Sequence, residues 1–171
     1  MSRISFVIPC YRSEKTIGAV VEEIKKTVGE REHEIILVND CSPDGTINEI
    51  KRLAAADSHI TGVDLARNFG QHAAIMAGLH QATGDVIVCL DDDGQTPADE
   101  MDRLLKKLDE GYDVVYASYT NKKHSGFRNW GSRLNSKMTE IMLGKPKQLQ
   151  ISSSFAMRRF IKDEMLRYEG C

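Results

Sequence analysis

Three consecutive carboxylates, Asp91 to Asp93, directly follow the apolar run Val86 to Leu90. Adjacent acids repel one another, and a bound cation would relieve this repulsion. Mg²⁺ and Mn²⁺ bind hard oxygen ligands, commonly one or two protein carboxylates together with substrate phosphates. The triplet therefore favours a divalent metal site. A solvated loop or a helix N-cap is the alternative, although Asp99 and Glu100 already supply acids for the first turn of the next helix.

The elements that position these acids follow from hydrophobic patterning. The run 86–90 is rich in Val and Ile, as in a strand buried on both faces of a parallel sheet. Similar strands are predicted at 4–8, 33–38, 60–65 and 112–117, and helices are predicted between them. Ser13 is expected to cap the first of these helices. This alternation predicts an α/β fold with a mainly parallel sheet and helices on both faces. Beyond it we expect helices at 127–143 and 160–168 and a last strand within 148–157.

Polar loops follow three of the predicted strands, at residues 9–14, 39–44 and 91–95. The carboxyl ends of parallel strands meet at one edge of the sheet, where ligands bind in open α/β folds. The converging acids suit a metal, a nucleotide or acid/base chemistry. Dinucleotide binding through GxGxxG is disfavoured because the first loop, PCYRSE, has no glycine, and the chain has no GxxxxGK phosphate loop. A phosphoacceptor receiver domain is disfavoured because no acid pair follows the first strand.

Length and charge narrow the class of protein. With 171 residues, the chain is expected to form a single domain spanning residues 1–171. It carries 23 Lys and Arg against 25 Asp and Glu, which gives no electrostatic case for a nucleic acid partner. No signal peptide or apolar segment of about 20 residues is present, which predicts a soluble, cytosolic chain as given. Because the sequence stops at Cys171 without a closing element, we expect a truncated C-terminus.

Five segments resemble family 2 glycosyltransferases of the GT-A, Rossmann-like type. They are FVIPCY, VNDCSPDGT, RNFGQHAAIMAGLHQATGD, CLDDDGQTP and EGYDVVYASY, and the likeness extends over about residues 3–160. Within the family, the chain is most similar to the branch that glycosylates polyprenyl phosphates, such as dolichyl-phosphate mannose synthases and bactoprenol glucosyltransferases. The resemblance implies an inverting transfer of a sugar from a nucleoside diphosphate sugar to an undecaprenyl or dolichyl phosphate, with Mg²⁺ or Mn²⁺ as cofactor.

The same resemblance implies roles for individual residues. Asp91 and Asp93 match the acids of the DxD motif as catalytic and metal-binding residues, and Gln95 matches a further metal ligand. The residues expected around the nucleotide sugar are Pro9, Tyr11, Glu14, Asp40, Arg67, Asn68, Gln71 and Asp92. Arg128 and Arg133 resemble arginines that face the acceptor phosphate. A half-buried core aromatic is the alternative for Tyr11, and helix capping is the alternative for Arg67, Asn68 and Gln71.

One position departs from the family pattern. Many relatives carry an acid immediately before Phe-Arg in the last strand, whereas here Ser154 precedes Phe155. A sugar hydroxyl acceptor needs a carboxylate base, but a phosphate monoester has a second pKa of about 6 and is already largely dianionic near pH 7. Ser154 therefore favours a phosphate acceptor.

The resemblance also implies a location and partners for the whole protein. We expect the full-length enzyme at the inner, cytoplasmic face of the membrane, where it would meet its polyprenyl phosphate. A homo-oligomer is compatible with the family resemblance. Two alternatives stay open at this stage. One is a soluble family 2 transferase that extends a cell-surface saccharide, and the other is a non-catalytic fragment that binds nucleotide sugars.

Overall fold

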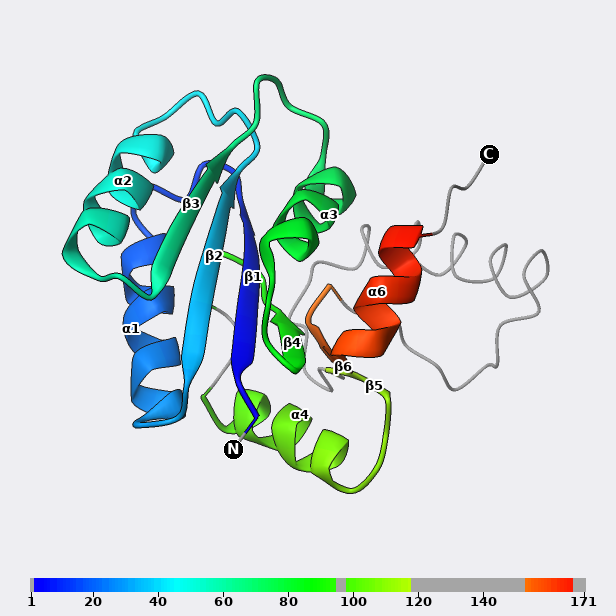
Figure 1. The fold of residues 1–171 in the computed structure, drawn as a ribbon. Coiled ribbons are helices and arrows are strands. Elements are labelled where there is room, and N and C mark those ends of the chain that lie inside the picture. Colours follow the sequence, from blue (N-terminus) through cyan, green and yellow to red (C-terminus); the bar gives the residue numbers. More distant parts are fainter. Residues whose placement is uncertain (1, 95–97, 118–152, 168–171) are drawn as a thin grey trace, which may run out of the picture.

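A six-stranded sheet forms the centre of the computed structural model, which describes residues 2–94, 98–117 and 153–167 (Figure 1). The strand order is β3-β2-β1-β4-β6-β5. The strands are β1 (Ile4–Cys10), β2 (His33–Asn39), β3 (Ile60–Asp64), β4 (Val86–Cys89), β5 (Val114–Tyr116) and β6 (Phe155–Arg158). Strands β1, β2, β3 and β4 all run parallel to one another. The predicted α/β fold with a mainly parallel sheet is confirmed.

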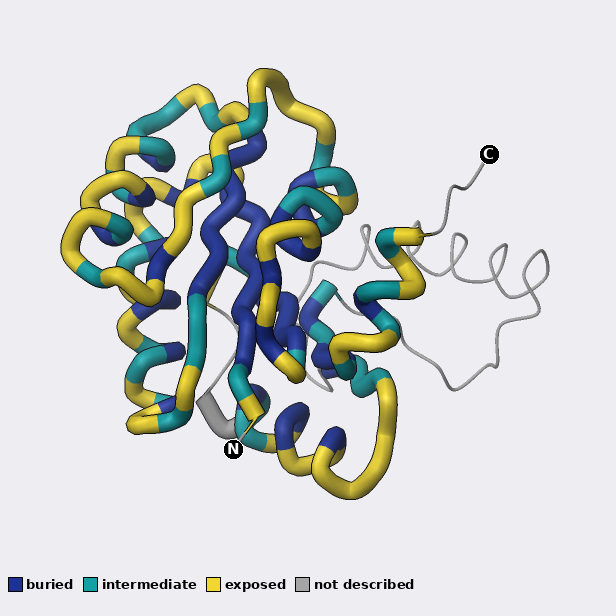
Figure 2. The backbone as a smooth tube through the Cα atoms, viewed as in Figure 1, coloured by how far each residue is buried: buried dark blue, intermediate teal, exposed yellow. Residues whose placement is uncertain are grey.

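Helices cover both faces of this sheet (Figure 1). They are α1 (Ile17–Val28), α2 (Thr46–Ala56), α3 (Gln71–Gln81), α4 (Ala98–Asp109) and α6 (Arg159–Arg167). Side chains of α1, α2 and α4 pack with Phe6 and Ile8 of β1 in one core, whereas α3 and α6 pack with Val7 in the other. Successive residues of a strand point to opposite faces, so the fully apolar strands serve two cores. Figure 2 shows the buried sheet between helices whose outer surfaces are exposed.

The far edge of the sheet differs from the sequence-based expectation. The predicted fifth strand, β5, does not lie beside β4, because β6 is inserted between them and runs antiparallel to both. Cys89 of β4 pairs with Phe155 of β6. A chain that returns in this way joins positions that are distant in the sequence, which local patterning cannot reveal. The insertion brings the segment before Phe155 to the edge where β4 ends.

The start of α1 also corrects an expectation. The sequence predicts Ser13 as the cap of this helix, but α1 begins at Ile17 and its N-cap residue is Thr16. The carbonyl of Ser13 accepts the backbone N–H groups of Thr16 and Ile17 in the preceding turn. Its hydroxyl donates to the Asp92 carboxylate, so this side chain joins the loop after β1 to the segment after β4.

None of the helices within the described residues is long and apolar enough to cross a membrane. The predicted helix 127–143 lies outside those residues.

Candidate functional site

The carboxyl ends of β1, β2 and β4 meet at one edge of the sheet, as their parallel pairing requires. Three loops leave this edge: one leads from β1 to α1, one from β2 to α2, and one from β4 towards α4. The segment between β3 and α3 reaches the same region, because the Leu65 N–H donates to the Asn39 carbonyl at the end of β2. The predicted polar residues are therefore brought close together by four neighbouring strands.

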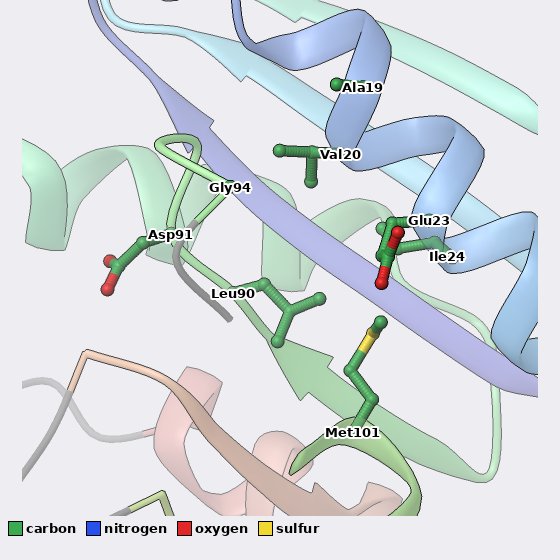
Figure 3. A pocket seen from close by; sticks show the side chains of 8 residues that line it. All are labelled: Ala19, Val20, Glu23, Ile24, Leu90, Asp91, Gly94 and Met101. Atoms are coloured by element: carbon green, nitrogen blue, oxygen red, sulfur yellow. The ribbon is translucent and has the colours of Figure 1, made fainter. Parts of the chain in front are cut away.

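Asp91 connects two elements that are distant in sequence. Its Oδ1 accepts a hydrogen bond from Nε2 of Gln71, the first residue of α3, at 3.0 Å. Its Oδ2 accepts the hydroxyl of Ser153, just before β6, at 2.6 Å, and the Ser154 hydroxyl lies 3.4 Å from the same oxygen. Figure 3 shows the carboxylate pointing away from the side chains between α1 and α4. Asp91 therefore faces α3 and β6.

Asp92 points to a different set of partners. Its Oδ2 accepts the Tyr11 backbone N–H at 3.0 Å and also the hydroxyl of Ser13. Asp92 lies in the turn that follows β4, and its carboxylate is directed to the loop after β1 instead of towards the partners of Asp91. Asp92 therefore fastens the loop after β1, while Asp93 is exposed.

Asp40 is buried at the end of β2 and holds the segment before α3. Its Oδ1 accepts the Phe69 backbone N–H at 2.8 Å, and its Oδ2 accepts the Gly70 N–H at 2.9 Å. The guanidinium of Arg67 lies over the Phe69 ring, 4.5 Å from its centroid. Asp40 therefore fixes the backbone between Arg67 and the first residue of α3.

A cavity of about 300 Å³ opens between these loops. Its lining residues come from all four strand ends and are Pro9, Cys10, Tyr11, Asp40, Asn68, Gly70, Gln71 and Asp92. Of the residues expected around a nucleotide sugar, the structure brings Pro9, Tyr11, Asp40, Asn68, Gln71 and Asp92 together here. Tyr11 is 44% exposed, which disfavours the alternative of a core aromatic.

Two of the expected residues lie beside this cavity instead of lining it. The Glu14 carboxylate accepts the Gly45 backbone N–H at 3.2 Å, which ties the loop after β1 to the loop after β2. Arg67 stacks on the Phe69 ring. Their predicted contacts with a nucleotide sugar stay predictions.

Three of the predicted residues, Gln95, Arg128 and Arg133, lie outside the described residues. Sequence reasoning missed Ser13 and Ser153 as partners of the acidic triplet. The run SSSF marks a polar segment ahead of a strand, but nothing local to it indicates that Asp91 lies opposite.

A second cavity, of about 340 Å³, lies between α1 and α4. Figure 3 shows Leu90, Val20 and Met101 around it, with Glu23 as a polar neighbour. Its lining is mainly apolar, and the Asp91 carboxylate points away from it. The polar groups suited to a nucleotide are gathered at the first cavity.

The electrostatics of the edge limit its chemistry. Burial, and then the nearby charge of Asp92, raise the pKa of the Cys10 thiol far above its usual range. Cys10 therefore stays a neutral thiol that neither attacks a substrate nor binds a metal readily.

Within the described residues, no three His, Cys, Asp or Glu side chains are arranged to hold a metal ion by themselves.

The loop after β2 is organised around Asp44. Partial burial acts to raise its pKa, but hydrogen bonds from the hydroxyls of Ser42 and Thr46 and from two backbone N–H groups outweigh this effect and lower the pKa to about 2. The Ser42 hydroxyl also accepts the Arg12 backbone N–H at 2.7 Å. Asp44 is therefore ionised at neutral pH and links the loops after β1 and β2.

Comparison with known proteins identifies the family. The chain belongs to glycosyl transferase family 2, whose model matches residues 5–166. The resemblance seen in the sequence motifs is thereby confirmed. The chain is 37% identical over 170 residues to the undecaprenyl-phosphate 4-deoxy-4-formamido-L-arabinose transferase of Proteus mirabilis. That match covers 98% of this chain and 52% of the relative, so the chain spans about half the length of that protein.

Solved structures show the same GT-A fold. Glucosyl-3-phosphoglycerate synthase from Mycobacterium tuberculosis, in complex with Mn²⁺, uridine diphosphate and phosphoglyceric acid, matches with a TM-score of 0.70 and 25% identity, over 94% of this chain and 57% of that one. A mannosyltransferase from Pyrobaculum calidifontis, in complex with GDP-Man and Mn²⁺, has a TM-score of 0.70 and 20% identity, over 96% of this chain and 46% of that one.

Proposed function

We propose that this chain is the nucleotide-sugar domain of an inverting glycosyltransferase that transfers a sugar from a nucleoside diphosphate sugar to a polyprenyl phosphate. The observation that carries the proposal is the cavity of about 300 Å³ at the carboxyl edge of the sheet, in a member of glycosyl transferase family 2. Ligands of α/β folds bind at this edge. The similarity to an undecaprenyl-phosphate sugar transferase supports the choice of acceptor.

The lining of this cavity suits a nucleotide. The half-exposed Tyr11 ring offers an apolar surface to a base or ribose, and the Asn68 amide offers both a donor and an acceptor. Each carboxylate oxygen of Asp40 can accept a second hydrogen bond beyond the one it receives from the protein backbone. Asp40 can therefore hold the loop and also accept an N–H from a base.

A divalent metal fits the donor chemistry of the β4 loop. Asp91 and Asp93, with Gln95, supply oxygen atoms of the kind that Mg²⁺ and Mn²⁺ prefer, and such ions usually take only one or two protein carboxylates beside substrate phosphates. The Mn²⁺ and uridine diphosphate in the mycobacterial relative support this assignment. A bound metal would act as a Lewis acid that offsets the negative charge on the departing diphosphate. In-line attack from the opposite face of the sugar would invert the anomeric carbon.

A phosphate acceptor fits the surroundings of Asp91. Ser154 is buried, and its hydroxyl lies 3.4 Å from the Asp91 carboxylate. A serine hydroxyl is not a base at neutral pH, so the side chain at position 154 offers no base beside Asp91. A polyprenyl phosphate is already ionised near pH 7 and needs no base. We propose that Arg128 and Arg133 face this phosphate and that the whole protein works at the cytoplasmic face of a membrane.

Nucleotide binding tests the donor side of the proposal. Thermal unfolding of the chain is followed with UDP, GDP and their sugar conjugates, each with Mn²⁺ and with EDTA. We expect one nucleoside diphosphate to raise the melting temperature, and to raise it more with Mn²⁺.

Two variants separate the metal from the nucleotide. Asp93→Asn should lose the Mn²⁺-dependent part of the shift, while Asp109→Asn, an exposed acid on α4, should keep it. Equal shifts with metal and with chelator would contradict the metal assignment, and the absence of any nucleotide effect would contradict the donor assignment.

A further inference from the structure

The Asp91 carboxylate is held on both oxygens by uncharged donors. The Gln71 amide donates to Oδ1 at 3.0 Å, and the Ser153 hydroxyl donates to Oδ2 at 2.6 Å. These donors lie 20 and 62 positions from Asp91 in the sequence: Gln71 is the first residue of α3, and Ser153 lies in the segment before β6. Two anchors of this kind restrict rotation of the carboxylate about its side-chain bonds.

The sheet register places Ser153 opposite Asp91. Strand β6 runs antiparallel to β4, with Cys89 paired to Phe155. In an antiparallel pair, two steps forward along one strand match two steps backward along the other. Continuing the register beyond the last paired residues therefore sets Asp91 against Ser153. Both residues lie just outside the paired strands, and the insertion of β6 beside β4 brings their segments together.

The Gln71 side of the contact is also supported by backbone structure. Gln71 is the first residue of α3, and the Gly70 N–H immediately before it is held by the buried Asp40 carboxylate at 2.9 Å. The backbone at the start of α3 is therefore fixed by Asp40, and this fixes the position from which the Gln71 amide donates to Asp91.

The anchors leave Oδ1 of the carboxylate able to accept more. Each ionised oxygen has two acceptor positions: Oδ1 receives one hydrogen bond, from Gln71, whereas Oδ2 receives a short one from Ser153 and a longer one, of 3.4 Å, from Ser154. Uncharged donors orient the carboxylate without cancelling its charge. Outer partners of this type typically alter metal affinity about 10- to 100-fold when they are removed.

We propose that Ser153 and Gln71 are positioning residues, which hold the Asp91 carboxylate in the orientation that receives the divalent cation of a nucleoside diphosphate. This inference rests on the proposed function, because it assumes that a nucleotide and a cation bind at this edge. Neither residue touches the reacting atoms in this role. Both act through Asp91.

Direct cation binding tests the role of Ser153. Mn²⁺ affinity is measured by electron paramagnetic resonance in the presence of UDP or GDP, whichever binds the wild-type chain. Ser153→Ala should weaken Mn²⁺ binding about 10- to 100-fold. Nucleotide affinity in EDTA should stay within about 2-fold of wild type, because the alanine removes no group that lines the nucleotide cavity.

Three further variants make the result specific. Ser153→Thr keeps the hydroxyl and should restore most of the Mn²⁺ affinity. Gln71→Ala should weaken Mn²⁺ binding from the other side of Asp91. Ser5→Ala removes a hydroxyl bond of 2.6 Å to the Glu34 carboxylate at the opposite end of the sheet, and it should lower stability without changing Mn²⁺ affinity.

The outcomes separate this inference from the function on which it rests. If wild type binds nucleotide and Mn²⁺ but Ser153→Ala binds Mn²⁺ equally well, the positioning role is wrong and the proposed function stands. If Ser153→Thr is as weak as Ser153→Ala in a folded protein, the hydroxyl is not the cause and the inference also fails. If wild type binds neither nucleotide nor Mn²⁺, both proposals are overturned.

Discussion

The Asp40 carboxylate accepts the Gly70 backbone N–H at 2.9 Å, although the two residues are 30 positions apart. This bond joins the end of β2 to the residue that precedes α3, and a second bond from Phe69 reinforces it. Both Asp40 and Gly70 line the cavity proposed for the nucleotide. The stability of the loop and the shape of the cavity therefore depend on the same carboxylate.

Replacing Asp40 by Asn should weaken both properties. An asparagine offers one carbonyl oxygen, and its amide N–H₂ would face the second backbone donor, which is then left unpaired in a buried site. We expect a loss of about 1 to 3 kcal/mol in the free energy of unfolding, measured with urea, together with weaker nucleotide binding.

A control for this variant is Asp85→Asn. Asp85 is exposed and accepts the Arg3 backbone N–H at the other end of the sheet, so its replacement should cost less and leave nucleotide binding unchanged. An Asp40→Asn protein as stable as wild type would show that these two backbone bonds contribute little.

Gly70 offers a test of the loop backbone alone. Its φ of 89° lies in the region that side chains disfavour, and a Cβ there would meet no other atom within 4 Å. Gly70→Ala should therefore destabilise the chain by about 1 to 2 kcal/mol through backbone strain without a steric clash. Because the strain acts where the cavity is lined, nucleotide affinity should fall as well.

Gly29 provides the matched comparison. It has a φ of 56°, a Cβ at this position would also meet open space, and it ends α1 away from the cavity. Gly29→Ala should lose similar stability by urea unfolding but bind nucleotide as wild type does in calorimetry. Equal nucleotide affinities for the two alanine variants would argue against a role for the loop conformation at Gly70.

Asp44 should contribute a pH-dependent share of the stability. Its pKa in the folded protein, about 2, lies below the ordinary value of 3.8, because hydrogen bonds from Ser42 and Thr46 outweigh the opposing effect of burial. A lowered folded pKa stabilises the protein above the unfolded pKa, and this contribution is lost as the pH falls from about 4 towards 2.

The Asp44→Asn variant should therefore be less stable than wild type at pH 7, and the difference should shrink as the pH falls below about 4. Urea unfolding at pH 7, 4 and 3 measures it. A difference that stays constant across this range would mean that the Asp44 charge is not what stabilises the loop.

The sequence was sufficient to predict the first four strands, because each is a short apolar run followed by turn residues. It also predicted that Asp40 and Asp91 lie near each other, since both follow parallel strands at the same edge. It could not show that Asp40 binds the backbone of Phe69 and Gly70, because that contact depends on how a loop folds over the end of β2.

The position of β6 was the main feature beyond the reach of sequence patterning. Alternation of helices and strands predicts parallel neighbours, whereas β6 enters between β4 and β5 in the opposite direction. The contact between Ser153 and Asp91 joins the segment before β6 to the segment after β4, so it depends on that insertion.

The central claim is transfer of a sugar to a polyprenyl phosphate, and the lipid product tests it most directly. Membranes that contain the full-length protein are incubated with radiolabelled nucleotide sugars, and the lipid phase is extracted. We predict a labelled glycosyl phosphate lipid that mild acid hydrolyses, with much less label when Asp93 is replaced by Asn. Label that appears only in water-soluble saccharide, with none in the lipid phase, would contradict the proposed acceptor.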